Sequence, residues 1–217
     1  MRNSFLVAVL AWLLVLFCQN LPAIAHPQMN GDWAIVSGIE KFWVEPAELL
    51  LSLGLSSLAV QRAKQRSLSL LLLLPIFWII GAVLGFYAPP IVILNLVTTP
   101  GLEIIGKNPS LLLAIGLIAV GSLVALEKKM SKIWFQVFVI VEGIFSGLIN
   151  GLLLSGHPGG INGLAGETVM IWLFVFFTVL LLKKVSTPWI NLAIRIGGSW
   201  ISAAGLLLFG FLLKYPQ

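Results

Sequence analysis

The chain has 217 residues, of which 59% are hydrophobic and only 10% are charged, and its mean hydropathy is +1.05. Soluble globular domains carry about 25% charged residues, so this composition excludes that class and predicts an integral membrane protein. The net charge of +5 requires no nucleic acid partner, because the basic residues gather in short connections between apolar runs. A single all-α transmembrane bundle in contact with lipid is the expected fold.

Residues 1–25 have the pattern of a secretory signal peptide. Arg2 precedes an apolar run over residues 5–17, and Ala23-Ile24-Ala25 has the small-x-small pattern of a leader peptidase site. Cleavage there would leave His26 as the first residue of a mature chain, 26–217, that starts outside the cytoplasm. An uncleaved first span is the alternative interpretation, and it gives the next segment the same location. The single cysteine, Cys18, lies in this leader, so cysteine chemistry is not expected in the mature chain.

Six apolar runs after the leader approach the thickness of a bilayer core. They predict transmembrane helices at residues 42–60, 68–86, 110–126, 133–154, 168–182 and 189–213. Between the second and third predicted helices, the apolar part of segment 87–108 is too short to cross a bilayer. Because unpaired backbone is not tolerated in lipid, this segment is expected to pack on the bundle as an interfacial or re-entrant piece.

Basic residues concentrate in alternate connections of the predicted bundle. These residues are Arg62, Lys64 and Arg66 in the first connection, Lys128, Lys129 and Lys132 in the third, and Lys183 and Lys184 in the fifth. The positive-inside rule places all three connections in the cytoplasm, so both mature termini are expected outside it. With the leader, this orientation favours the inner membrane of a bacterium.

Two acidic residues lie near the outer end of the first predicted helix. Glu45 and Glu48 are one helical turn apart, and paired carboxylates suit a hard divalent cation or a proton. Glu45 is interpreted as an interfacial carboxylate in contact with water, beside Pro46 at a helix start. For the deeper Glu48, a wetted carboxylate and a cation ligand are both open interpretations.

The fourth predicted helix carries one polar stripe in an apolar surface. Glu142, Ser146 and Asn150 recur at every fourth residue, which places them on one face. A carboxylate at membrane depth needs a partner, a cavity or an ion, so this stripe is the strongest candidate for a transport pathway. The alternative is a carboxyl group that ties helices together, with Ser199 or Ser202 as its partner.

The remaining ionisable residues give weaker signals. His157 lies in a glycine-rich loop and is a metal ligand candidate, although a turn residue is the more common role. Glu167 is expected at the start of the fifth helix, where a carboxylate complements the helix dipole. Arg195 is expected to reach the cytoplasmic interface rather than pair with Glu142. No catalytic motif or cofactor-binding motif is present, so an enzyme is not expected.

The layout resembles the HupE/UreJ family of small membrane proteins, which are associated with nickel or cobalt uptake. The resemblance rests on the leader before His26-Pro27, six short spans, a polar first helix over residues 38–54, and Phe145-Ser146-Gly147-Leu148-Ile149-Asn150-Gly151. The family motif reads Phe-His-Gly-x-x-His-Gly, so Ser146 and Asn150 stand where its histidines would be. In the first helix, residues such as Lys41 and Glu48 stand in place of the family's His and Asp-His groups.

This resemblance implies a permease for divalent metal ions, either nickel and cobalt or a harder cation. Because nickel and cobalt sites favour imidazole, the oxygen ligands present here suit a harder ion. The predicted pathway consists of Glu48, Glu142, Ser146 and Asn150, and the candidate metal ligands are Glu48, Glu142, Asn150 and His157. A non-transporting scaffold or assembly factor is the alternative function, and passage of protons or a small solute through the stripe is a third.

Overall fold

The computed structural model describes residues 34–62, 66–87, 110–127, 131–155, 157, 159–184 and 188–214. Within these ranges the chain forms helices and no strand, which confirms the all-α prediction. The helices are α2 (Ala34–Val44), α3 (Pro46–Arg62), α4 (Arg66–Tyr87), α7 (Ser110–Ala125), α8 (Lys132–Leu154), α9 (Gly160–Lys184) and α10 (Pro188–Lys214). The predicted leader, His26 and most of the segment 87–108 lie outside the described residues.

Four of these helices, α4, α8, α9 and α10, are long and apolar enough to cross a membrane. The bent pair of α2 and α3 makes a fifth if it is counted as one span. Helix α7 is apolar, but its 16 residues reach about 24 Å, which is less than the core of a typical bilayer. The structure therefore supports four or five crossings rather than establishing the six that were predicted.

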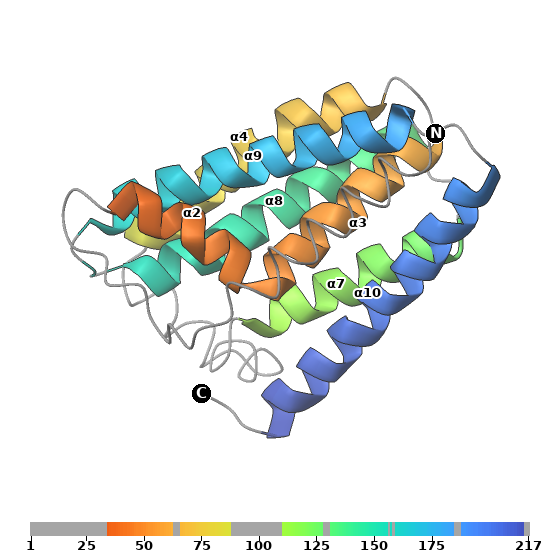
Figure 1. The fold of residues 1–217 in the computed structure, drawn as a ribbon. Coiled ribbons are helices and arrows are strands. Elements are labelled where there is room, and N and C mark those ends of the chain that lie inside the picture. The colour runs from red at the N-terminus through yellow and green to blue at the C-terminus, as the bar shows by residue number, and fades with distance from the viewer. Residues whose placement is uncertain are drawn as a thin grey trace.

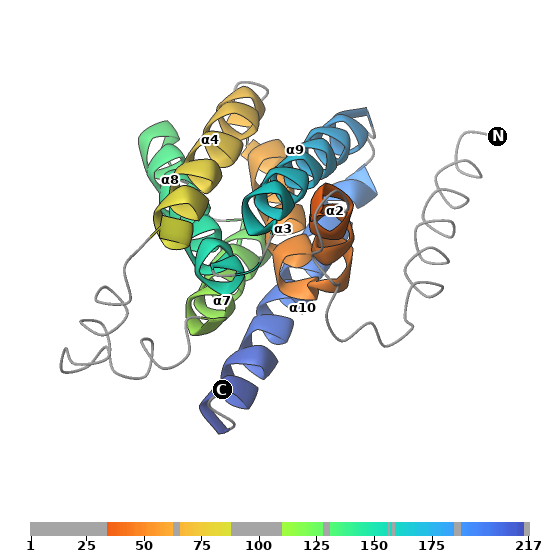
Figure 2. The same cartoon turned by 90° about the vertical axis from the view of Figure 1, so that its left-hand side faces the viewer.

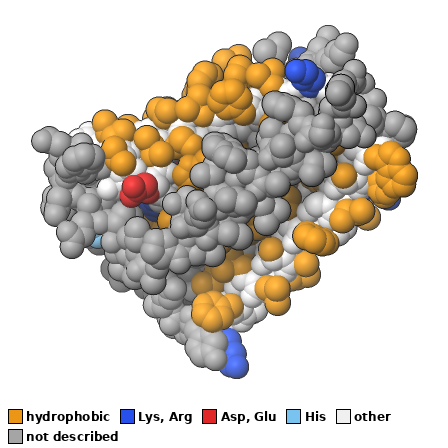
Figure 3. Space-filling view, viewed as in Figure 1, with side chains coloured by type: hydrophobic (Ala, Val, Ile, Leu, Met, Phe, Trp, Pro, Cys, Tyr) orange, Lys and Arg blue, Asp and Glu red, His pale blue; other side chains and the backbone are white. Residues whose placement is uncertain are grey.

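The helices run along one another in close pairs around α3. Helix α4 packs on α8, α7 packs on α10, and α2 packs on α9, while α3 touches α2, α4, α7, α9 and α10 (Figures 1 and 2). The helix ends that flank the three basic connections gather at one end of the bundle, on the right of Figure 1. Hydrophobic side chains cover much of the outer surface, including α10 (Figure 3), as lipid contact requires.

Small residues allow these pairs to approach closely. A Cβ atom added at Gly147 would overlap the backbone of Trp78 and Ala82 on α4, and one added at Gly81 would overlap the backbone of Ile144 on α8. Without a hydrophobic driving force between helices in lipid, such backbone contact is a main source of association. The glycines of the 145–151 motif are therefore explained by packing of α8 on α4.

The first predicted span differs from the structure, because the chain is helical from Ala34 and bends by 73° between α2 and α3. Pro46 has no backbone N–H to donate to Phe42, and its ring disfavours a straight continuation. The fifth predicted span also differs, because α9 begins at Gly160 instead of residue 168. Gly163 and Gly166 fit against the backbone of α2 at Gly38 and Ile35.

A hydrogen bond between serines joins α7 to α10. Ser122 Oγ and Ser202 Oγ are 3.1 Å apart, beside the close backbone approach of Gly121. We expect Ser202→Ala to lower the free energy of unfolding by about 0.6 kcal/mol, the typical strength of an interhelical hydrogen bond in a membrane. Unfolding by SDS in mixed micelles would measure this loss. Ser122→Ala should add nothing further in the Ser202→Ala background, and full additivity would contradict the assignment.

Candidate functional site

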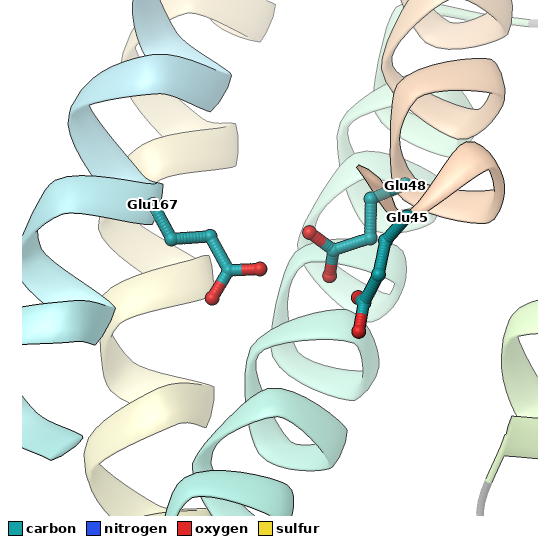
Figure 4. Close-up of side chains that lie close together, drawn as sticks. All are labelled: Glu45, Glu48 and Glu167. Carbon is teal, nitrogen blue, oxygen red and sulfur yellow. The ribbon is translucent and has the colours of Figure 1, made fainter. Parts of the chain in front are cut away.

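Three carboxylates meet near the end of the bundle opposite the basic connections. Glu45 lies at the α2–α3 junction, Glu48 in the first turn of α3 and Glu167 on α9, and each offers an oxygen within 4.8 Å of the others (Figure 4). Glu48 and Glu167 are buried, whereas the Glu45 side chain is 35% exposed. Among the described residues, this is the one group of three or more acidic, histidine or cysteine side chains with ligand atoms so close.

The ammonium group of Lys41 lies among these carboxylates. Its Nζ is 2.7 Å from Glu167 Oε1 and 3.1 Å from Glu45 Oε2, and it also donates to Asn150 Oδ1. Lys41 is only 8% exposed. Since a buried charge is tolerated only when it is paired and hydrogen-bonded, the three acceptors account for a lysine at this depth.

Side chains from α8 and α4 complete the site around Glu48. Ser146 Oγ donates to Glu48 Oε1 over 3.2 Å and accepts from Trp78 Nε1 over 3.2 Å. Asn150 donates from Nδ2 to the same carboxylate oxygen, so its amide links Glu48 to Lys41. The carboxylates and the lysine therefore belong to one hydrogen-bonded network across α2, α3, α4, α8 and α9.

Two carboxylate oxygens in this network accept no hydrogen bond from any donor among the described residues. They are Glu48 Oε2 and Glu167 Oε2, and both are buried. An ionised carboxylate has four acceptor positions, and leaving a buried oxygen unpaired is costly. Oxygens with unused lone pairs, on two helices and in one cluster, are what a hard cation requires as ligands.

Local sequence explains why these groups converge. The bend before Pro46 turns α2 back so that Lys41, one turn before Glu45, faces the first turn of α3. Gly147 and Gly151 on α8 approach α4 on one face, while Ser146 and Asn150 face Glu48. The carboxylate of Glu48 in the first turn of α3 also complements the positive end of that helix dipole.

Of the predicted pathway residues, the structure brings Glu48, Ser146 and Asn150 together and leaves Glu142 apart. The Glu142 carboxylate lies beside Gly116 of α7, where a Cβ atom would be 2.7 Å from Oε2. Its alternative partners are engaged elsewhere, since Ser202 contacts Ser122 and Ser199 donates to the carbonyl of Arg195. The three-residue stripe on α8 therefore divides between two faces of the bundle.

His157 is exposed in the short connection between α8 and α9 and does not join the carboxylate group. Its backbone has a structural role, because its N–H donates to Leu154 and its carbonyl accepts from Gly160 at the start of α9. Arg195 is exposed, as expected, and its Nε donates to the carbonyl of Ala125. That contact places a positive charge at the C-terminal end of α7, where it complements the helix dipole.

Two residues at the centre of the site, Lys41 and Glu167, were not predicted as site residues. Lys41 directly precedes the first predicted transmembrane helix, where a lysine is usually a flanking residue at the membrane surface. The prediction for Glu167 was wrong in position, because it lies two turns inside α9 and pairs with Lys41 instead of standing at the helix start. The signal available in the sequence was the set of small residues, Gly38, Gly163 and Gly166, that predicts close packing of these two segments.

No protein-family model, curated protein or solved structure matches this chain.

Proposed function

We propose that this protein carries a divalent cation across the membrane and binds it at the site formed by Glu45, Glu48 and Glu167. The observation that carries the proposal is the convergence of three carboxylates, two of which have a buried oxygen that no donor of the described residues reaches. With one lysine among three carboxylates, the formal charge of the ionised cluster is −2. This negative charge would attract a divalent cation.

The donor set supports a hard cation rather than nickel or cobalt. Carboxylate, amide and hydroxyl oxygens are the preferred ligands of calcium, magnesium and manganese, whereas nickel sites favour imidazole nitrogen. The described part of the site contains no histidine. The resemblance to the HupE/UreJ family supports metal transport as the general activity. The oxygen ligands present here support a harder cation than the nickel or cobalt associated with that family.

The placement of charge supports inward transport. The acidic cluster lies near the end of the bundle that the positive-inside rule assigns to the outside, and the helix ends that flank the basic connections lie at the other end (Figure 1). Negative charge at an outer opening would concentrate cations there. In this proposal the host membrane is the inner membrane of a bacterium.

Uptake of Mn²⁺ into proteoliposomes tests the proposal. We expect Glu48→Gln to reduce the initial rate at low Mn²⁺ by at least about tenfold, because it removes one charged ligand from a buried site, and tenfold corresponds to about 1.4 kcal/mol. Glu40→Gln is the matched control, since Glu40 carries the same carboxylate in an exposed position on α2 and its loss should leave uptake unchanged. Equal uptake by wild type and Glu48→Gln, at equal reconstitution, would reject the site.

The same uptake assay tests whether Glu142 belongs to the transport route. Since its carboxylate faces α7 and stands outside the cluster, Glu142→Gln should keep the wild-type rate. A loss of uptake in this variant would extend the route from the acidic cluster toward α7.

A non-transporting scaffold is the second candidate function, and the position of Lys41 favours it. The lysine already satisfies one oxygen each of Glu45 and Glu167, as a structural ion pair would. Wild-type proteoliposomes that accumulate no more Mn²⁺ than protein-free liposomes would support this candidate and exclude manganese transport.

A further inference from the structure

We propose that Lys41 is a tethered cation that occupies the binding site when no ion is bound, so that an incoming ion must displace its ammonium group. This inference rests on the proposed function, because it concerns the same three carboxylates. In this inference Lys41 competes with the ion and so lowers the affinity of the site. When no ion is bound, Lys41 neutralises part of the charge of the carboxylates.

The hydrogen bonds of Lys41 are those expected of a bound cation. An ammonium group has three N–H donors, and here they reach three acceptors on different parts of the fold, namely Glu45, Glu167 and Asn150. Two of these acceptors belong to the group that would bind a metal ion. The ammonium and the ion would therefore compete for the same oxygens.

The unpartnered oxygens show that Lys41 fills the site incompletely. Within the part of the chain that the structure describes, Glu48 Oε2 and Glu167 Oε2 accept no hydrogen bond while Lys41 is in place, although both lie within the same buried cluster. A monovalent ammonium leaves a formal charge of −2, as calculated above. A divalent ion in place of the ammonium would bring the formal charge of the three carboxylates from −3 to −1, and it can use these two oxygens as well as those that Lys41 now holds.

The fold gives Lys41 a means of withdrawing. Lys41 is carried by α2, which is set at 73° to α3, and it joins the site through a flexible four-carbon stem. The Glu45 end of its network is 35% exposed, so the ammonium has a route toward water on that side. In this inference the displaced ammonium turns toward water on the Glu45 side.

Binding of Mn²⁺ to the purified protein in detergent, measured by isothermal titration calorimetry, tests the inference. We expect Lys41→Met to bind Mn²⁺ at least about tenfold more tightly than wild type, and Lys41→Gln, which can still donate a hydrogen bond, to show an increase as well. Lys41→Arg retains the positive charge and should keep the weaker affinity. Lys132→Met is the control for loss of a positive charge at an exposed position remote from the cluster.

A second measurement covers the case in which the Lys41 variants are less stable. An ion that binds only the folded state raises the melting temperature, so Mn²⁺ should stabilise Lys41→Met more than it stabilises wild type. Merely structural damage would reduce this shift instead of raising it. Equal or weaker binding by folded Lys41→Met and Lys41→Gln would overturn the inference.

The outcomes for this inference and for the proposed function are distinct. If wild type and Lys41→Met both bind, with the variant tighter, the inference stands. If only the lysine variants bind, Lys41 blocks the site permanently, so its displacement by an ion is rejected together with transport of Mn²⁺ by the wild type. If neither binds, both are rejected.

Discussion

Replacement of Gly147 by valine is expected to be among the most destabilising single changes in this protein. A Cβ atom at this position would lie 2.8 Å from Ala82 N and 2.9 Å from Trp78 C, in addition to overlapping the Trp78 carbonyl oxygen. All three are backbone atoms, which cannot move aside by a change of rotamer. Helices α4 and α8 would have to separate, and we expect a loss of about 3 kcal/mol in the free energy of unfolding.

Unfolding in mixed micelles would measure this loss, with Gly197→Val as the matched control. Gly197 lies on α10, and nothing stands within 4 Å of a Cβ added there, so the same substitution should change the stability by less than about 0.5 kcal/mol. If Gly147→Val were as stable as the control, the close approach of α4 and α8 would be wrong. Because Gly147 neighbours Ser146, loss of Mn²⁺ binding should accompany the loss of stability.

Glu167→Met is expected to have a comparable effect through charge rather than shape. Glu167 is fully buried and its Oε1 is 2.7 Å from the Lys41 ammonium, which is itself buried. Removing Glu167 takes away the nearest counter-charge of the buried ammonium and leaves the partly exposed Glu45 as its ion pair, so we expect a loss of up to about 3 kcal/mol in the free energy of unfolding. The methionine has a similar length, so little of this loss would come from a cavity.

A double variant separates the ion pair from other contributions. Lys41→Met with Glu167→Met removes both members of the pair, and we expect its loss of stability to be smaller than the sum of the two single losses, because the contact between these two charges is lost in each single variant. Glu40→Met removes an exposed carboxylate on α2 and should change the stability little. If Glu167→Met retained wild-type stability, the buried pair would have no energetic role.

Much of the helical architecture could be predicted from the sequence because its cause is local. Apolar runs bounded by basic residues indicate helices wherever lipid requires internal hydrogen bonding, and α4, α8 and α10 begin and end within two residues of the predicted bounds. The two larger differences, at Pro46 and at the start of α9, both involve proline or glycine. At those residues the conformation depends on packing between α2 and α9, which no hydropathy window contains.

The site was predictable where its residues lie one helical turn apart on the same helix, as Glu45 and Glu48 do and as Ser146 and Asn150 do. Ser146 and Asn150 were identified because they recur at helical spacing, but the same spacing grouped them with Glu142, which faces α7. Helical periodicity indicates approximately which face of a helix a side chain occupies, but it does not tell which neighbouring helix that face contacts. Lys41 and Glu167 are 126 residues apart, and only the tertiary packing of α2 on α9 brings their charges together.

The pairing of the helices determines how the site would have to open. Ser146 and Asn150 belong to α8, which is locked to α4 through glycine contacts, while Lys41 and Glu167 belong to α2 and α9, which are locked together in the same way. Each pair is thus held together by close backbone contact, and the polar network joins one pair to the other. Any motion that exposes the site alternately to the two sides of the membrane would slide or tilt one pair against the other, with Glu48 on the central helix as the pivot.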